Sequence, residues 1–142
     1  MRRRVFLLFL AAAVPLASAR AQSVNAADQA AFERIITAQI EAFRADDGPG
    51  AYAFAAPMIQ QVFPTAEHFM AMVRQGYRPV YRPQSFRFGK AGQDAAGRPT
   101  QLVTIVGPDG KTYEALYTME RQADGSWKIA GCRLLEAPGL NT

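Results

Sequence analysis

The side chains in this sequence that could carry out chemistry are few, and they lie far apart along the chain. His68 is the only histidine, and an imidazole with a pKa near neutrality suits general acid-base catalysis. Asp47 follows another aspartate, and such carboxylates can act as general bases or bind hard cations. Tyr113 and Tyr117 would share one face of a strand, where their hydroxyls could donate to a substrate oxygen. One tyrosine together with Asp47 or His68 could therefore serve a small isomerase or dehydratase-like enzyme.

Each of these residues also has a structural interpretation. Asp47 precedes Gly48-Pro49, where its carboxylate would cap the next helix. His68 would lie at the solvent boundary of a helix, and the tyrosine rings would pack in the core with their hydroxyls at its rim. We recognise no Ser-His-Asp set, phosphate-binding loop, dinucleotide fingerprint or metal-ligand spacing. The sequence therefore predicts no catalytic residues, no cofactor and no metal site, which favours a non-catalytic protein.

Five basic residues and no acidic residue lie between Glu67 and Asp94. Aromatic residues alternate with them, as they do on surfaces that bind phosphates and stacked bases. We predict candidate anion-binding residues at Arg74, Arg78 and Arg82, for a small anion, a lipid headgroup or an acidic protein. The alternative is a solvated charged face above an apolar inner face.

The first residues have the parts of a secretory signal peptide. Arginines at positions 2 to 4 precede an apolar run that ends near residue 17, and small residues follow. Cleavage after Ala19 or Ala21 fits this pattern, and we prefer Ala21, which removes residues 1–21. We predict a periplasmic or secreted protein that uses the general secretory route, although Arg3-Arg4 also resembles a twin-arginine signal.

Removal of this segment changes the charge argument. The whole chain has 16 basic and 12 acidic residues, but four arginines belong to the signal peptide, so the mature chain is neutral. A general affinity for polyanions loses its support, and nucleic acid is not an expected partner. No later segment approaches the roughly 20 apolar residues of a membrane span, so integral membrane association is not expected either.

Residues 22–142 are sufficient for one domain with one hydrophobic core. Cys132 is the single cysteine and cannot form an internal disulfide, so packing must hold the fold. Its strand-like surroundings favour an inert buried thiol, and a reactive or intermolecular thiol is the alternative.

Three helices are predicted in the first half of this domain. Residues 25–46 carry apolar side chains at helical spacing. A short second helix occupies residues 51–55 and is stopped by Pro57. The third starts at the capping residue Thr65 and runs to residue 75, with Gly76 as a left-handed stop.

Four strands follow, because the apolar period changes to two residues. Their expected ranges are 85–90, 100–107, 112–121 and 126–135. Gly107-Pro108-Asp109-Gly110 and Asp124-Gly125 are tight-turn sequences, so neighbouring strands should pair antiparallel. The sequence therefore predicts an α+β fold in which three N-terminal helices pack on a curved four-stranded meander.

This order resembles the nuclear transport factor 2-like, cystatin-like cone fold. FAAP at residues 54–57, YRPVY at 77–81 and GSWKIAGC at 125–132 resemble a bacterial secreted family, domain of unknown function 4864, and the resemblance covers about residues 27–135. The cone fold implies a cavity between sheet and helices, which some members use for isomerase or dehydratase chemistry and many for binding or dimerisation. The narrower family implies no activity, and the catalytic carboxylates of the cone-fold enzymes match no position here.

An aromatic and methionine-containing set could serve as core and as pocket wall. The candidate lining residues are Phe43, Phe54, Phe69, Met72, Tyr113, Tyr117 and Trp127. We predict a non-catalytic binding or interaction module for a small apolar or anionic ligand, which could form a homodimer through its sheet. The enzyme and the anion-binding surface remain as alternatives.

Overall fold

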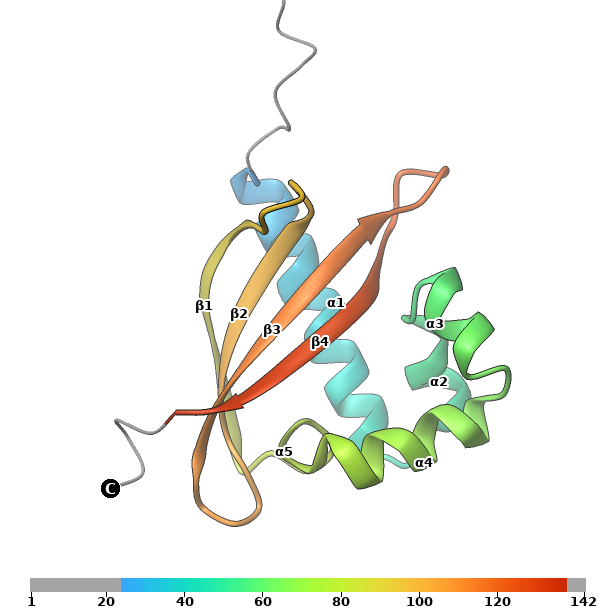
Figure 1. Cartoon of the computed structure of the whole chain (residues 1–142), viewed down its shortest axis with the longest axis vertical. Coiled ribbons are helices and arrows are strands. Elements are labelled where there is room, and N and C mark those ends of the chain that lie inside the picture. The colour runs from blue at the N-terminus through green and yellow to red at the C-terminus, as the bar shows by residue number, and fades with distance from the viewer. Residues whose placement is uncertain (1–23, 138–142) are drawn as a thin grey trace, which may run out of the picture.

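The computed structural model describes residues 24–137, so the predicted signal peptide and both cleavage positions lie outside the described residues. Helices precede strands in this part of the chain (Figure 1). The helices are α1 (Ala26–Arg44), α2 (Gly48–Ala53), α3 (Pro57–Val62), α4 (Ala66–Gly76) and α5 (Arg78–Tyr81). The strands are β1 (Ser85–Gln93), β2 (Pro99–Val106), β3 (Thr112–Arg121) and β4 (Trp127–Glu136). The predicted α+β class and element order are confirmed.

The long helix α1 follows the predicted pattern. The Asn25 side chain accepts a hydrogen bond from the backbone N–H of Asp28 at 2.8 Å, which caps the helix. The buried large apolar residues of its inner face are Phe32, Ile36, Ile40 and Phe43. In residues 24–137 no helix is both long enough and apolar enough to cross a membrane.

The helices α2 and α3 correct the prediction of a single short helix at residues 51–55. Asp47 caps α2, because its carboxylate accepts a hydrogen bond from the backbone N–H of Gly50 at 3.0 Å, and the helix therefore starts at Gly48. Pro57 follows α2 and also begins α3. At the first position of a helix the backbone N–H has no partner within the helix, so a proline there loses no hydrogen bond.

The end of α4 also differs from the prediction. Thr65 caps its start as expected, but a left-handed stop at Gly76 is wrong. Gly76 is the last helical residue, and it is not among the described glycines with positive φ. The backbone N–H of Tyr77 bonds to the carbonyl of Val73 at 2.9 Å, and the unpredicted helix α5 then starts at Arg78, with Pro79 in its first turn.

The four strands form an antiparallel sheet in the order β1-β2-β3-β4. The expected tight turns join β2 to β3 and β3 to β4, where Gly110 and Gly125 adopt positive φ angles of 79° and 86°. The pairing of β3 with β4 shifts by one residue after Thr118, which leaves Ala130 as an extra residue in β4. Such a bulge bends its strand and increases its twist.

The helices cover one face of this twisted sheet. Figure 1 shows α1 behind the strands and α2, α3 and α4 beside the β4 edge. Buried residues of α1, α2, α4 and the sheet form one continuous core. At the β4 edge, the backbone of Ile129 exchanges hydrogen bonds with Phe54 and Ala56, each at 2.8 Å. The segment between α2 and α3 is thereby attached to the sheet.

Candidate functional site

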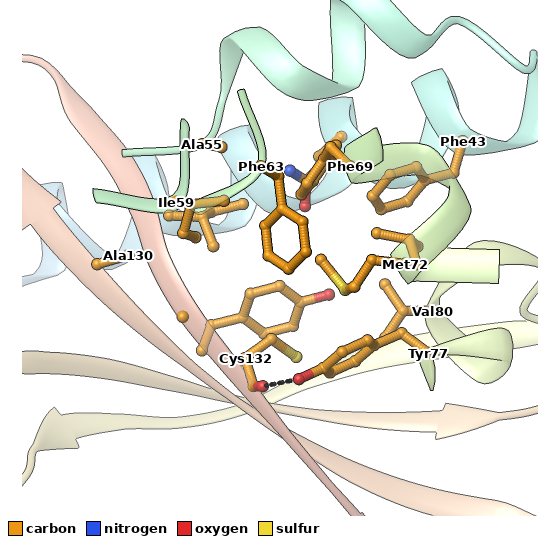
Figure 2. A pocket seen from close by; sticks show the side chains of 15 residues that line it. Phe43, Ala55, Ile59, Phe63, Phe69, Met72, Tyr77, Val80, Ala130 and Cys132 are labelled. Carbon is orange, nitrogen blue, oxygen red and sulfur yellow. Dashed lines mark hydrogen bonds between the residues drawn. The ribbon is translucent and has the colours of Figure 1, made fainter. Parts of the chain in front are cut away.

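A cavity of about 340 Å³ lies between the β3–β4 half of the sheet and the helices. Side chains from α1, α3, α4, α5, β3 and β4 line it. Figure 2 shows Phe63 and Met72 reaching into it from the helical side, with Tyr77 and Cys132 at its lower wall. The cavity therefore depends on segments that are far apart in the sequence.

The helical wall follows from two short amphipathic stretches. In α4, Phe69, Met72 and Val73 share the face that points to the cavity, as the apolar spacing predicts. In the α3 region, Ile59 and Phe63 are four residues apart and so lie on one face. The cavity wall is mostly apolar for this reason.

The sheet wall contains the polar atoms that matter most. Tyr117 on β3 and Cys132 on β4 are directly opposite each other in the antiparallel pairing, and both line the cavity. Tyr117 is 1% exposed, and its hydroxyl is a buried side-chain atom with no hydrogen-bond partner in residues 24–137. Among the described residues that line the cavity, no other side chain has a buried nitrogen or oxygen atom without a hydrogen-bond partner.

Burial controls the ionisation of this pair. Desolvation raises the pKa of Tyr117 well above its usual value of 10, and the neighbouring Cys132 thiol adds to the rise. Burial also raises the pKa of Cys132 to about 12, and the adjacent Tyr117 hydroxyl, which lies near the thiol without the geometry of a hydrogen bond, partly opposes this rise. The phenol and the thiol are therefore both protonated at neutral pH.

The other polar side chains of the wall already have partners. The Tyr77 hydroxyl donates to the carbonyl oxygen of Cys132 at 3.0 Å (Figure 2). Gln39 donates from Nε2 to the carbonyl oxygen of Ala51 at 3.1 Å, which ties α1 to α2. Burial raises the pKa of Tyr77, and the neighbouring Cys132 contributes to the rise. These two side chains stabilise the wall of the cavity.

The residues proposed for acid-base chemistry do not reach this cavity. Asp47 is exposed and caps α2, and His68 is exposed near the start of α4. No Asp, Glu, Lys, Arg or His is among the residues that line the cavity. The described residues also contain no group of three or more His, Cys, Asp or Glu side chains that could hold a metal ion.

The structure brings together four of the seven candidate pocket residues, Phe43, Phe69, Met72 and Tyr117. The remaining three do not line the cavity. Phe54 lies at the β4 edge, where its carbonyl oxygen accepts from Ile129. Tyr113 donates its hydroxyl to Asp109 at 2.6 Å, near the β2–β3 turn. Trp127 packs edge-on against Phe32, with ring centroids 4.9 Å apart.

Sequence reasoning missed Ile59, Tyr77 and Cys132 as lining residues. Ile59 and Phe63 belong to the unpredicted α3 region, where Pro57 was interpreted only as a stop. The four-residue spacing of these two apolar side chains was the available signal. Tyr77 and Cys132 carried none, because their cavity positions depend on the contact between the end of α4 and β4.

The candidate anion-binding arginines do meet at one place, outside this cavity. Arg74, Arg78 and Arg82 line a surface hollow of about 370 Å³ together with Tyr81 and Pro108. We call this site the arginine hollow. Arg87 and Lys90, the other two bases of the segment, lie on β1 and do not line it.

Comparisons with known proteins give one family match and one structural match. The family described as "Domain of unknown function (DUF4864)" matches residues 25–142. No curated protein matches the sequence. The structure of ActVI-ORFA from Streptomyces coelicolor is similar with a TM-score of 0.48 and 17% identity, over 77% of this chain and 96% of that chain. No functional conclusion follows from a similarity of this size.

Proposed function

We propose that this chain, which belongs to the DUF4864 family of domains of unknown function, binds a small, uncharged and largely apolar molecule without transforming it. The observation that carries the proposal is the apolar cavity, in which the buried Tyr117 hydroxyl has no hydrogen-bond partner among residues 24–137. The ligand lies among the side chains of α3, α4 and the β3–β4 pair.

The composition of the wall supports the neutral, apolar character of the ligand. A volume of about 340 Å³ is within the range of small-molecule pockets. The wall has no charged side chain, so a buried ionic group would lose its hydration without gaining a counterion. Any charged part of the ligand would stay outside the cavity.

The Tyr117 hydroxyl supports the presence of an oxygen acceptor on the ligand. A buried hydroxyl that lacks a partner costs about 1–3 kcal/mol. Because its pKa is raised, Tyr117 keeps its proton and can donate to a carbonyl, ether or hydroxyl oxygen. Such a ligand would offset the cost of the unpartnered group.

The same wall favours binding over catalysis. General acid-base catalysis uses a group whose pKa lies near the working pH. The pKa of Cys132 is about 12, and that of Tyr117 is also strongly raised, so neither side chain can exchange a proton readily near pH 7. Asp47 and His68 do not line the cavity, so they supply no alternative base or acid there.

The proposal includes the site of action, which is outside the cytoplasm. It rests on the arginine-rich start, the short apolar run and the small residues before residue 22. N-terminal sequencing of the protein recovered from its host tests this part. A mature chain that starts at residue 20 or 22 supports export, and an uncleaved chain found with cytoplasmic proteins contradicts it.

Native mass spectrometry of the mature protein purified gently from its own host tests the binding proposal. We expect a copurifying neutral molecule in the wild type and its loss in Met72→Trp, which fills the cavity from α4. Met58→Trp is the matched control, because Met58 is 71% exposed on α3 and does not line the cavity. Nile red, a neutral apolar dye, serves as the probe if the molecule is lost during purification.

Two results would contradict the proposal. The first is a wild-type protein that carries no molecule and does not take up Nile red. The second is equal uptake by the wild type and a folded Met72→Trp variant, since the cavity would then not be the binding site.

A further inference from the structure

The arginine hollow is a second site, with no lining residue in common with the apolar cavity. Arg74 comes from the last turn of α4, Arg78 starts α5, and Arg82 follows α5. Pro108, in the turn between β2 and β3, completes the hollow. The helix end, the turn and the short helix α5 therefore bring three guanidinium groups around one space.

Arg82 is held in place by the surrounding chain. Its Nη1 donates to the carbonyl oxygens of Phe43 and Tyr81, and its Nη2 pairs with the Asp46 carboxylate at 2.8 Å. Its guanidinium also lies 4.0 Å from the centroid of the Tyr81 ring, at cation-π distance. Little conformational freedom is left for Arg82 to lose when a ligand binds.

Tyr81 also positions Arg74, while Arg78 remains available. Arg74 donates from Nε to the Tyr81 hydroxyl at 3.4 Å, and its guanidinium is 5.8 Å from the ring centroid. Arg78 has no side-chain hydrogen bond or ion pair in residues 24–137, although its side chain lines the hollow. The five N–H donors of the planar Arg78 guanidinium group are therefore free to bind an oxyanion.

Asp46 is the acidic group that contacts this cluster. It has a positive φ of 52°, accepts a hydrogen bond from the Tyr81 hydroxyl and pairs with Arg82. The hydrogen bonds from Tyr81 and then Arg82 lower the pKa of Asp46, so its carboxylate stays ionised. Three guanidinium charges and one carboxylate leave two positive charges at the arginine hollow.

Another acidic residue, Asp109, lines an adjoining hollow, and its carboxylate is already hydrogen-bonded. Asp109 shares that neighbouring space with Arg78, but its carboxylate accepts from the Tyr113 hydroxyl at 2.6 Å and from the backbone N–H of Lys111 at 3.0 Å. These bonds lower its pKa, the Tyr113 bond most. Asp109 and Arg78 form no ion pair within the described residues.

We infer that the arginine hollow binds a phosphate group, either on a soluble phosphomonoester or on a lipid headgroup. A phosphomonoester carries up to two negative charges near neutral pH, which match the two positive charges left at the hollow. Arginine forks bind phosphate oxygens with two parallel hydrogen bonds. Arg78 supplies the free fork, and Arg74 and Arg82 supply charge that their neighbours already orient.

Titration with inorganic phosphate at low ionic strength, followed by NMR chemical shifts, tests this site. We expect Arg78→Ala to weaken phosphate binding by about tenfold, because one charge-assisted contact is lost. Arg78→Lys keeps the charge but not the fork and should recover only part of the affinity. Asp46→Asn removes the competing carboxylate and should strengthen phosphate binding.

The matched control is Arg87→Ala, because Arg87 is an exposed arginine of β1 that does not line the hollow. This variant should bind phosphate like the wild type.

Sedimentation with phosphatidylcholine vesicles that contain phosphatidic acid distinguishes the two sources. Co-sedimentation that is lost in Arg78→Ala assigns the phosphate to a lipid headgroup. Phosphate binding without co-sedimentation assigns it to a soluble molecule. Both results support the site. The proposal is overturned if the wild type does not bind phosphate, if Arg78→Ala binds it as well as the wild type, or if Arg87→Ala loses as much affinity.

Discussion

The apolar cavity and the arginine hollow use the same short stretch of chain in opposite chemical ways. From α4 and α5, the cavity takes Phe69, Met72, Val73 and Val80, while the hollow takes Arg74, Arg78 and Tyr81. In the cavity, the wall is apolar and the buried Tyr117 hydroxyl has no hydrogen-bond partner among the described residues. In the hollow, solvent stays close, and positive charge exceeds the acid that contacts it. One segment can therefore serve two ligands of different polarity, because adjacent residues of a helix point in different directions.

Phe43 contributes to both the apolar cavity and the arginine hollow, so Phe43→Ala should have the largest effect on the free energy of unfolding. Its ring lines the cavity, its carbonyl oxygen holds Arg82, and it is 1% exposed. We expect a loss of about 3–5 kcal/mol in the free energy of unfolding, measured by urea denaturation. The control is Met58→Ala at an exposed position, which should change this free energy by less than about 0.5 kcal/mol. Equal losses in the two variants would mean that the cavity wall is not part of the core.

Alkaline pH should affect the cavity side through Cys132. Its pKa in the folded protein is about 12, compared with an ordinary value of 9.0. Above the ordinary value the unfolded chain loses the thiol proton while the folded chain keeps it, so stability falls as pH rises from about 9 towards 12. Urea denaturation over this range should show a smaller loss for Cys132→Ala than for the wild type. Parallel pH profiles would show that the thiol is not buried in solution.

A matched pair of tyrosine variants should separate binding from stability within the cavity. Tyr117→Phe removes a hydroxyl without a partner, so the free energy of unfolding should stay the same or rise by up to about 1 kcal/mol, while retention of the ligand falls. Tyr77→Phe removes a hydroxyl that donates to Cys132, and stability should fall by about 1 kcal/mol. Thermal melting and native mass spectrometry measure the two effects. A destabilised Tyr117→Phe would indicate that this hydroxyl has a structural partner.

The smallest effect on stability is expected at the hollow. Arg78→Ala should leave the melting temperature unchanged, because the exposed Arg78 side chain has no partner in the described residues. Added sodium chloride should weaken phosphate binding at the hollow and leave binding of a neutral cavity ligand unchanged. Titrations at two ionic strengths measure this difference. Equal salt dependence of the two ligands would remove the distinction between the sites.

Local signals predicted much of the fold. Thr65 caps α4, the turn glycines join the strands, and the apolar period places Tyr117 and Met119 on the buried face of β3. These features depend on residues close in sequence, which is why they can be recognised without a structure. Pro57 was misinterpreted because proline can both end one helix and begin the next.

Residue spacing predicts which face of a strand a side chain occupies, but not how far along the strand it lies. The candidate site was therefore harder to predict than the fold. Tyr113 and Tyr117 share one strand face but are separated by about 13 Å along the strand, so only Tyr117 reaches the cavity. Trp127 has the expected strand assignment but lies at the start of β4, against Phe32. The bond between Tyr77 and Cys132 spans 55 residues, and no local pattern indicates it.

The segment between α2 and α3 is attached to β4, and this attachment affects whether copies of the protein associate through their sheet edges at high concentration. An uncovered edge strand offers its backbone to the edge of a neighbouring molecule, and sheets can then grow from copy to copy. Here the backbone of Ile129 is occupied by Phe54 and Ala56, and the Cys132 carbonyl is occupied by Tyr77. The bulge at Ala130, between these two points, twists the edge further. The contacts that enclose the cavity therefore also protect this edge of the sheet from polymerisation.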